Sequence, residues 1–218
     1  MIVPIGRWVL SEACRQTVEW RAQQPEGSKL WVSVNLSTRQ LFEHDLVAVV
    51  REVLEESGLE PNALVLEITE GSLMEGVTET IEKLRGLKEL GVRLAIDDFG
   101  TGSSSLGYLR QFPIDILKID KSFVDDVATG SEGPALVFAI IEMAKTLNLG
   151  TVAEGIEESN QLNELVAAGC GSGQGFFFAR PLVPVALQTL LQQGMQASPP
   201  SSESTGDRAS AVSTRAST

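Results

Sequence analysis

Hydrophobic and polar positions along the chain alternate between a helical period and a strand period. Apolar residues recur at helical spacing in residues 5–23, 39–58, 77–91, 134–148, 159–169 and 183–193, with a shorter helix predicted at 104–112. Short runs rich in Val, Ile and Leu lie at residues 30–37, 63–70, 93–100, 116–121, 150–156 and 171–178. The pattern predicts strands that are each separated from the next by a helix.

Strands of this composition, connected by helices, indicate a parallel α/β sheet covered on both faces. The two candidate architectures are an open doubly wound sheet and a closed (β/α)₈ barrel. From residue 195 onward the chain is rich in Ser, Thr, Ala and Pro and has no apolar period. We therefore expect one domain at residues 1–194, followed by a disordered tail at 195–218.

Composition limits the classes of ligand. With 17 Lys and Arg against 29 Asp and Glu, the net charge is −12. A surface that binds duplex nucleic acid through its phosphates would need a basic excess, so we expect no such partner. An anionic ligand would need metal ions or a local basic residue to bind here. No apolar run reaches membrane-spanning length and no secretory signal is visible, so we expect no membrane contact by this segment.

Cysteine and histidine usage narrows the chemistry further. Cys14 and Cys170 lie far apart without the spacing of a metal site, and we expect free thiols in a reducing compartment, which favours the cytoplasm. His44, the only histidine, lies in the polar segment "FEHDL". A histidine-based metal site or a Ser-His-Asp triad is therefore not favoured.

Every predicted strand carries a polar residue near its carboxyl end. In chain order these are Asn35, Glu67, Asp97 with Asp98, Lys118, Glu154 and Gln174. Singly, each has an equally good structural interpretation, since Asn35 could cap a helix, Lys118 could extend to the surface and a glutamate could be solvated. Together they would require six coincidences at one edge of one sheet. Because the carboxyl ends of barrel strands hold the active site, the set favours a barrel with a site there.

Four carboxylates and one amide form an oxygen-donor set that suits Mg²⁺ or Mn²⁺. Two such ions can share a bridging carboxylate, hold a phosphate and lower the pKa of a bound water. They would also neutralise the adjacent Asp97 and Asp98, which repel each other at the end of an apolar strand. Lys118 would add positive charge where negative charge develops during the reaction.

The segments "VNLS", "LEITE", "LAIDDFGTGSSSLGYL", "LKIDKSFV", "VAEGIE" and "GQGFFFARPL" resemble the ordered motifs of the EAL-domain cyclic di-GMP phosphodiesterases, over roughly residues 1 to 190. The resemblance implies a modified TIM (β/α)₈ barrel. It also implies metal-dependent hydrolysis of one phosphodiester bond of cyclic di-GMP, giving linear pGpG, and a homodimer for the full-length protein.

Site roles follow from the resemblance residue by residue. The first metal ion would be bound by Asn35, Glu67 and Asp97, and the second by Asp97, Asp98 and Glu154. Lys118 would orient or activate the water, and with Glu154 it forms the expected catalytic pair. Three further residues are expected to support the loop or shape the site: Glu70 for the "DDFGTG" loop, and Glu157 and Gln174 for the metal and substrate surroundings.

Two departures from the family pattern affect the expected activity. Gly171 stands where the family has an acid, and the Glu-Ala-Leu strand, with its metal-binding glutamate and a substrate arginine, would precede Met1. The six strands also fall short of the eight of a closed barrel. We therefore expect a barrel without its first two strands and first helix, with impaired hydrolysis. The alternatives are a non-catalytic domain that binds cyclic di-GMP or a protein, or an inactive fragment of a larger signalling protein.

Overall fold

The computed structural model describes residues 1–23, 30–100, 106–127, 133–193 and 215–216. Its strands are β1 (Val32–Asn35), β2 (Leu64–Thr69), β3 (Arg93–Phe99), β4 (Ile116–Ile119), β5 (Gly150–Ala153), β6 (Ser172–Gly173) and β7 (Arg215–Ala216). Its helices are α1 (Ile2–Gln23), α2 (Thr38–Leu41), α3 (Leu46–Ser57), the 3₁₀ turn η2 (Pro61–Ala63), α4 (Glu70–Met74), α5 (Val77–Glu89), α6 (Leu106–Leu109), α7 (Lys121–Val127), α8 (Gly133–Thr146), α9 (Ser159–Ala168) and α10 (Pro184–Gln193).

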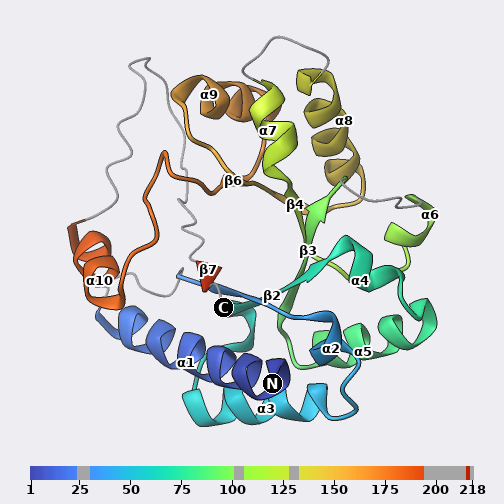
Figure 1. Cartoon of the computed structure of the whole chain (residues 1–218), viewed down its shortest axis with the longest axis vertical. Coiled ribbons are helices and arrows are strands. Elements are labelled where there is room, and N and C mark those ends of the chain that lie inside the picture. The colour runs from blue at the N-terminus through green and yellow to red at the C-terminus, as the bar shows by residue number, and fades with distance from the viewer. Residues whose placement is uncertain (24–29, 101–105, 128–132, 194–214, 217–218) are drawn as a thin grey trace.

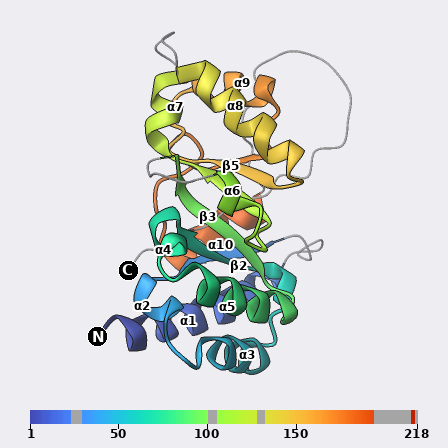
Figure 2. The same cartoon turned by 90° about the vertical axis from the view of Figure 1, so that its right-hand side faces the viewer.

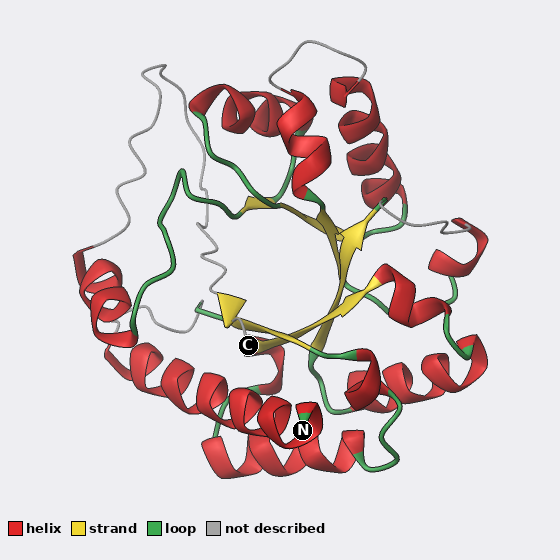
Figure 3. Ribbon diagram, in the orientation of Figure 1, coloured by secondary structure: helices red, strands yellow, loops and turns green. Residues whose placement is uncertain are grey.

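The strands form one parallel sheet in the order β6-β5-β4-β3-β2-β1-β7. The sheet curves into an arc and the helices lie outside it (Figures 1 and 3). Seen from the side, α7, α8 and α9 cover one half of the arc, and α1, α3 and α5 cover the other (Figure 2). In the described part of the chain the two ends of this order, β6 and β7, are not paired with each other. The predicted barrel architecture is confirmed, in incomplete form.

The strands β1 to β4 are apolar on the side that faces the helices. On β2, Leu64, Leu66 and Ile68 are at most 1% exposed and belong to the main core, which the helices share. Intervening positions such as Val65 face the inside of the arc, where they pack in a second, smaller apolar cluster. This burial on both faces explains the near-continuous apolar runs in the sequence.

Glycine ends two of the helices in the expected way. Gly58 follows α3 with φ 71°, and its N–H donates to Leu54 O at 2.9 Å. Gly169 follows α9 with φ 79°. Both backbones are left-handed, a conformation that costs glycine little. The helix end predicted at Gly58 is therefore confirmed.

The structure differs from the predicted elements in three places. Residues 39–58 form α2 and α3 instead of one helix, because a turn at residues 42–45 separates them. The short helices α4 and α7 were not predicted, since one or two turns are too few for a helical period to stand out. The last predicted strand, residues 171–178, contributes only the two residues of β6.

Most of the predicted disordered tail lies outside the described residues, at 195–214 and 217–218. Its disorder stays a prediction there. Arg215–Ala216, which the composition did not distinguish from the rest of the tail, pair with β1 in parallel, with Ser33 opposite Arg215 and Val34 opposite Ala216. Among the helices of the described residues, none is both long enough and apolar enough to span a bilayer.

Candidate active site

Strand alternation places four of the predicted site residues on the inner face of the arc. Successive side chains of a strand point to opposite faces, so residues two apart share one face. Each inward apolar residue of β2 to β5 is followed two positions later by a charged one, in the pairs Val65 and Glu67, Ala95 and Asp97, Ile116 and Lys118, and Val152 and Glu154. The apolar members pack together, and the charged members follow them toward the carboxyl ends of the strands.

Lys118 connects three of these strands. Its Nζ lies 2.7 Å from Glu67 Oε2, 2.9 Å from Asp97 Oδ1 and 2.6 Å from Glu154 Oε1. Lys118 is 1% exposed, and the three carboxylates are between 1% and 6% exposed. The sequence pattern placed Lys118 and these carboxylates at one edge of the sheet, and the structure brings each carboxylate into direct contact with Lys118.

The cluster keeps an excess of negative charge. Three carboxylates against one ammonium leave a formal charge of −3 + 1 = −2. Burial acts to lower the pKa of Lys118, but the attraction of Glu67, Glu154 and Asp97 outweighs it and raises the pKa above its usual value. Lys118 is therefore a fixed positive charge at neutral pH. It offsets one carboxylate and leaves the others for further cations.

A β-bulge brings Asp97 and Asp98 to the same side. The pairing of β3 with β4 shifts register between Ile96 and Phe99, so the two aspartates together lie opposite Lys118. Asp98 has φ 55°, and its N–H donates to Asp97 Oδ1 at 3.2 Å. In a regular strand the two carboxylates would point to opposite faces. The bulge re-aims one of them, a frequent device next to active sites.

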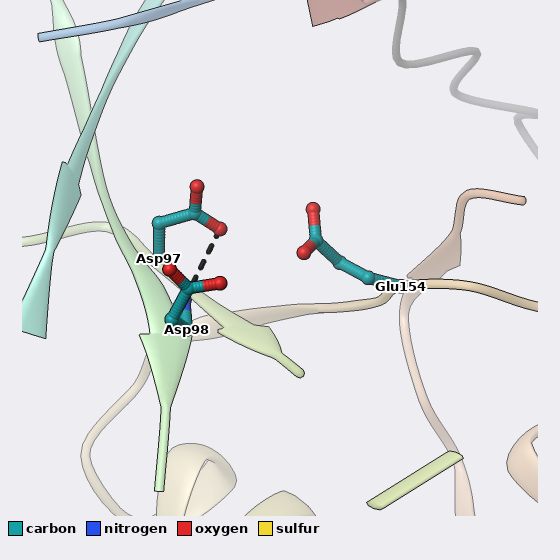
Figure 4. A group of neighbouring side chains, drawn as sticks. All are labelled: Asp97, Asp98 and Glu154. Atoms are coloured by element: carbon teal, nitrogen blue, oxygen red, sulfur yellow. Dashed lines mark hydrogen bonds between the residues drawn. The ribbon is translucent and has the colours of Figure 1, made fainter. Parts of the chain in front are cut away.

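Asp97, Asp98 and Glu154 form an oxygen-donor group suited to a divalent cation. One carboxylate oxygen from each lies within 4.8 Å of the others (Figure 4). Only oxygen ligands converge here, which fits a hard cation such as Mg²⁺, Mn²⁺ or Ca²⁺. These are the residues that the resemblance assigns to the second ion. Asn35, assigned to the first ion, pairs in register with Glu67 at the adjacent strand ends.

The supporting residues lie in different surroundings. Glu70 is 4% exposed, and its Oε2 accepts the N–H of Gly100 at 2.8 Å, the contact that its expected loop-supporting role requires. Gly100 has φ 96°, and residues 101–105 of the same loop lie outside the described part. Within the described residues, Gln174 Oε1 is buried without a hydrogen-bond partner.

Glu157 does not join Lys118 in the cluster. Its Oε1 instead pairs with Lys121 Nζ at 3.0 Å, and its side chain is 48% exposed. Two partners of Glu157 were missed from the sequence: Lys121, which pairs with its carboxylate, and Gln161, which accepts its backbone N–H at 2.8 Å. The spacing of Glu158 and Gln161, three residues apart, is the capping-box signal that could have identified Gln161.

Comparison with known protein families identifies one family that covers most of the chain. The EAL domain family is matched over residues 1–181. The chain belongs to the EAL domain family. It shares 44% identity over 183 residues with the bifunctional diguanylate cyclase/cyclic di-GMP phosphodiesterase MucR of Pseudomonas aeruginosa, covering 84% of this chain and 26% of MucR. It shares 42% identity over 197 residues with the signaling protein YkoW of Bacillus subtilis, covering 90% of this chain and 24% of YkoW.

Solved structures of EAL domains have a similar fold. The MucR phosphodiesterase in complex with c-di-GMP has a TM-score of 0.81 and 43% identity, over 85% of this chain and 74% of that one. The EAL domain of Mycobacterium smegmatis DcpA has a TM-score of 0.82 and 38% identity, over 87% and 85%. The chain thus spans most of these EAL structures, but only about a quarter of the length of the curated relatives described above.

Proposed function

We propose that this EAL domain hydrolyses one phosphodiester bond of cyclic di-GMP and releases linear pGpG. The observation that carries the proposal is the contact of Lys118 with three carboxylates from neighbouring strands, in a cluster that remains negatively charged. MucR, a relative at 44% identity, is named for this activity, and its phosphodiesterase domain is described in complex with c-di-GMP.

The donor set fits two divalent ions, Mg²⁺ or Mn²⁺. Asn35, Glu67 and Asp97 would hold one, and Asp97, Asp98 and Glu154 the other. Support for cations comes from the net negative charge of the buried cluster and from the convergence of three carboxylates within 4.8 Å. When bound, such ions lower the pKa of a coordinated water and neutralise the phosphate of the substrate. A structure of BlrP1 of Klebsiella pneumoniae, 28% identical to this chain, is described as a manganese and c-di-GMP complex.

The side chains of the protein have separate tasks in this proposal. Lys118, whose Nζ lies beside three carboxylates, would place positive charge where negative charge develops on the phosphate or the attacking oxygen. Glu154 is held by Lys118 at 2.6 Å and orients the water. The apolar cluster beneath these residues excludes bulk water from the inner end of the site and so strengthens each charge interaction.

The experiment is to incubate the chain with cyclic di-GMP and Mn²⁺ and to measure pGpG by chromatography. We expect pGpG to form, and to disappear when EDTA removes the metal. A parallel measurement of cyclic di-GMP binding by calorimetry distinguishes the classes of function. Tight binding without any pGpG, at saturating Mn²⁺, would show a binding domain and contradict the proposed hydrolysis.

We also propose that the protein is a homodimer acting in the cytoplasm. The free thiols of Cys14 and Cys170 support a reducing compartment. The apolar side chains of Leu136 and Phe138 on α8, which are 48% and 38% exposed, support a protein contact there. Sedimentation equilibrium tests the dimer, and a monomer at all concentrations would contradict it.

A further inference from the structure

The turn that carries Glu154 is tied to the helix that follows Lys118. Glu154 comes directly after β5, and its N–H donates to Ile119 O on β4 at 3.0 Å. Helix α7 begins at Lys121, three residues after Lys118. Any shift of residues 155–158 relative to α7 would move the backbone next to Glu154, from which its carboxylate extends.

Gln161 connects these two segments through a buried side chain. It is 4% exposed, and its Oε1 accepts the N–H groups of Glu157 at 2.8 Å and Glu158 at 2.9 Å. Its Nε2 donates to Val124 O at 3.4 Å and to Asp125 Oδ1 at 3.5 Å, both on α7. One amide thus holds the turn with its oxygen and the helix with its nitrogen.

Lys121 makes a second connection between the same segments. Its Nζ lies 2.8 Å from Asp125 Oδ1 and 3.0 Å from Glu157 Oε1. Its stem crosses Gly155, where an added Cβ would lie 2.4 Å from Lys121 Cγ. The Lys121 side chain is 44% exposed, so water and salt weaken its ion pairs. Gln161 is only 4% exposed, so water and salt screen its contacts less than those of Lys121.

We infer that Gln161 is a positioning residue for Glu154. By fixing residues 154–158 against α7, it keeps the Glu154 carboxylate beside Lys118 and in reach of Asp97 and Asp98. The consequence for metal binding and hydrolysis rests on the proposed function, whereas the effect on the turn does not. The competing interpretation is that Gln161 only caps the amino end of α9, because Glu158 and Gln161 also form a capping box.

Gln161→Glu separates these two interpretations. A glutamate keeps the oxygen that accepts the N–H groups of Glu157 and Glu158, so the cap survives. It removes the donor toward α7 and places a carboxylate next to Asp125. Adding Asp125→Asn supplies an amide that can donate to the new carboxylate and should rescue the contact. Asn163→Asp, at an exposed position of the same helix, is the control for the added charge.

The first measurement is amide hydrogen exchange of the metal-free chain. In Gln161→Glu we expect exchange across residues 154–158 to rise about tenfold or more, and to exceed any change in the rest of the chain. The second measurement is Mn²⁺ affinity by calorimetry. There we expect a loss of about 10- to 100-fold, the usual effect of removing a group that orients a metal ligand. The double variant should recover both, and Asn163→Asp should match the parent in both.

The outcomes are distinguishable from those of the proposed function. If the parent neither binds Mn²⁺ nor forms pGpG, the proposed function fails, and the exchange measurement alone decides the role of Gln161. Unchanged exchange across residues 154–158 in Gln161→Glu would overturn the inference. If the parent binds Mn²⁺, faster exchange in Gln161→Glu with an Mn²⁺ affinity equal to that of the parent would also overturn it. Failure of the added Asp125→Asn change to restore the parent values would do the same.

Discussion

Cys14 and Lys118 are buried to the same degree but in opposite chemical surroundings. Cys14, on the inner side of α1, is 0% exposed, and burial raises the pKa of its thiol to about 12. Lys118, on the inner face of the arc, is 1% exposed, yet its three carboxylate partners overcome the effect of burial and raise its pKa. Burial without an ionic partner keeps a group neutral, while burial among opposite charges keeps it charged.

The same contrast holds for the two faces of the strands. The helix-facing residues Leu66 and Leu117 contribute stability through apolar burial alone. One position later on each strand, Glu67 and Lys118 are buried at a cost in desolvation that their pairing must offset. The inner face therefore carries paired buried charges, a cost in desolvation that fits the proposed catalytic site.

Among the substitutions proposed as tests, Asp97→Asn should have the largest effect, and that effect should be on activity. Asp97 is the residue expected to bridge both ions, so we expect Mn²⁺-dependent pGpG formation to fall about 10³-fold or more. The free energy of unfolding should not fall, because the change removes one carboxylate from a cluster that has an excess of them. Chromatography measures the rate of pGpG formation, and urea denaturation measures the free energy of unfolding. The control is Asp45→Asn, at an exposed position. Near-normal turnover by Asp97→Asn would refute the two-metal proposal.

Lys118→Met should affect both activity and stability. Loss of the ammonium leaves Glu67, Asp97 and Glu154 buried without their common partner. We expect kcat to fall about 10²- to 10⁴-fold and the free energy of unfolding to drop by about 3–5 kcal/mol in the absence of metal. Saturating Mn²⁺ should restore part of that stability. Unchanged kcat with only a raised KM would show instead that Lys118 anchors substrate.

Leu117→Ala tests the outer face at the adjacent position of the same strand. Leu117 is 0% exposed, so the cavity should cost about 2–5 kcal/mol of unfolding free energy. Because its side chain points away from the cluster, Mn²⁺ affinity of the folded fraction should stay at the parent value. Leu136→Ala, at a leucine that is 48% exposed, is the control and should cost about 0.5 kcal/mol or less. A marked loss of Mn²⁺ affinity in Leu117→Ala would show that the two faces are not independent.

The smallest effect is expected for alkylation of Cys14, which tests the burial of a group that has no ionic partner. With its pKa near 12, roughly one thiol in a thousand is ionised at pH 9, so iodoacetamide should not label native Cys14. Urea should allow labelling, and mass spectrometry locates the adduct. Since the folded pKa is raised above the unfolded value near 9, this group should lower stability as pH rises above about 9. Rapid labelling of Cys14 in the folded chain would mean that α1 opens readily.

The sequence determined the order of β1 to β6 and of the longer helices, because apolar periodicity records which side of each element is buried. It also determined the oxygen-donor chemistry at the strand ends, since the types and positions of Asn35, Glu67, Asp97, Lys118 and Glu154 are visible along the chain. The expected helix end at Gly58 needed only local backbone physics.

Only the tertiary structure decided how these groups meet. Lys118 contacts Glu67, 51 residues away in the chain, because the register of parallel strands places them together. Asp97 and Asp98 share one side only because the pairing of β3 with β4 contains a bulge. The pairing of Glu157 with Lys121, and the position of Gln161 between α7 and the Glu154 turn, likewise arise from packing between α7, α9 and residues 154–158. Local patterns fix the direction of a side chain along its own element, whereas its partners depend on register and on contacts between elements far apart in sequence.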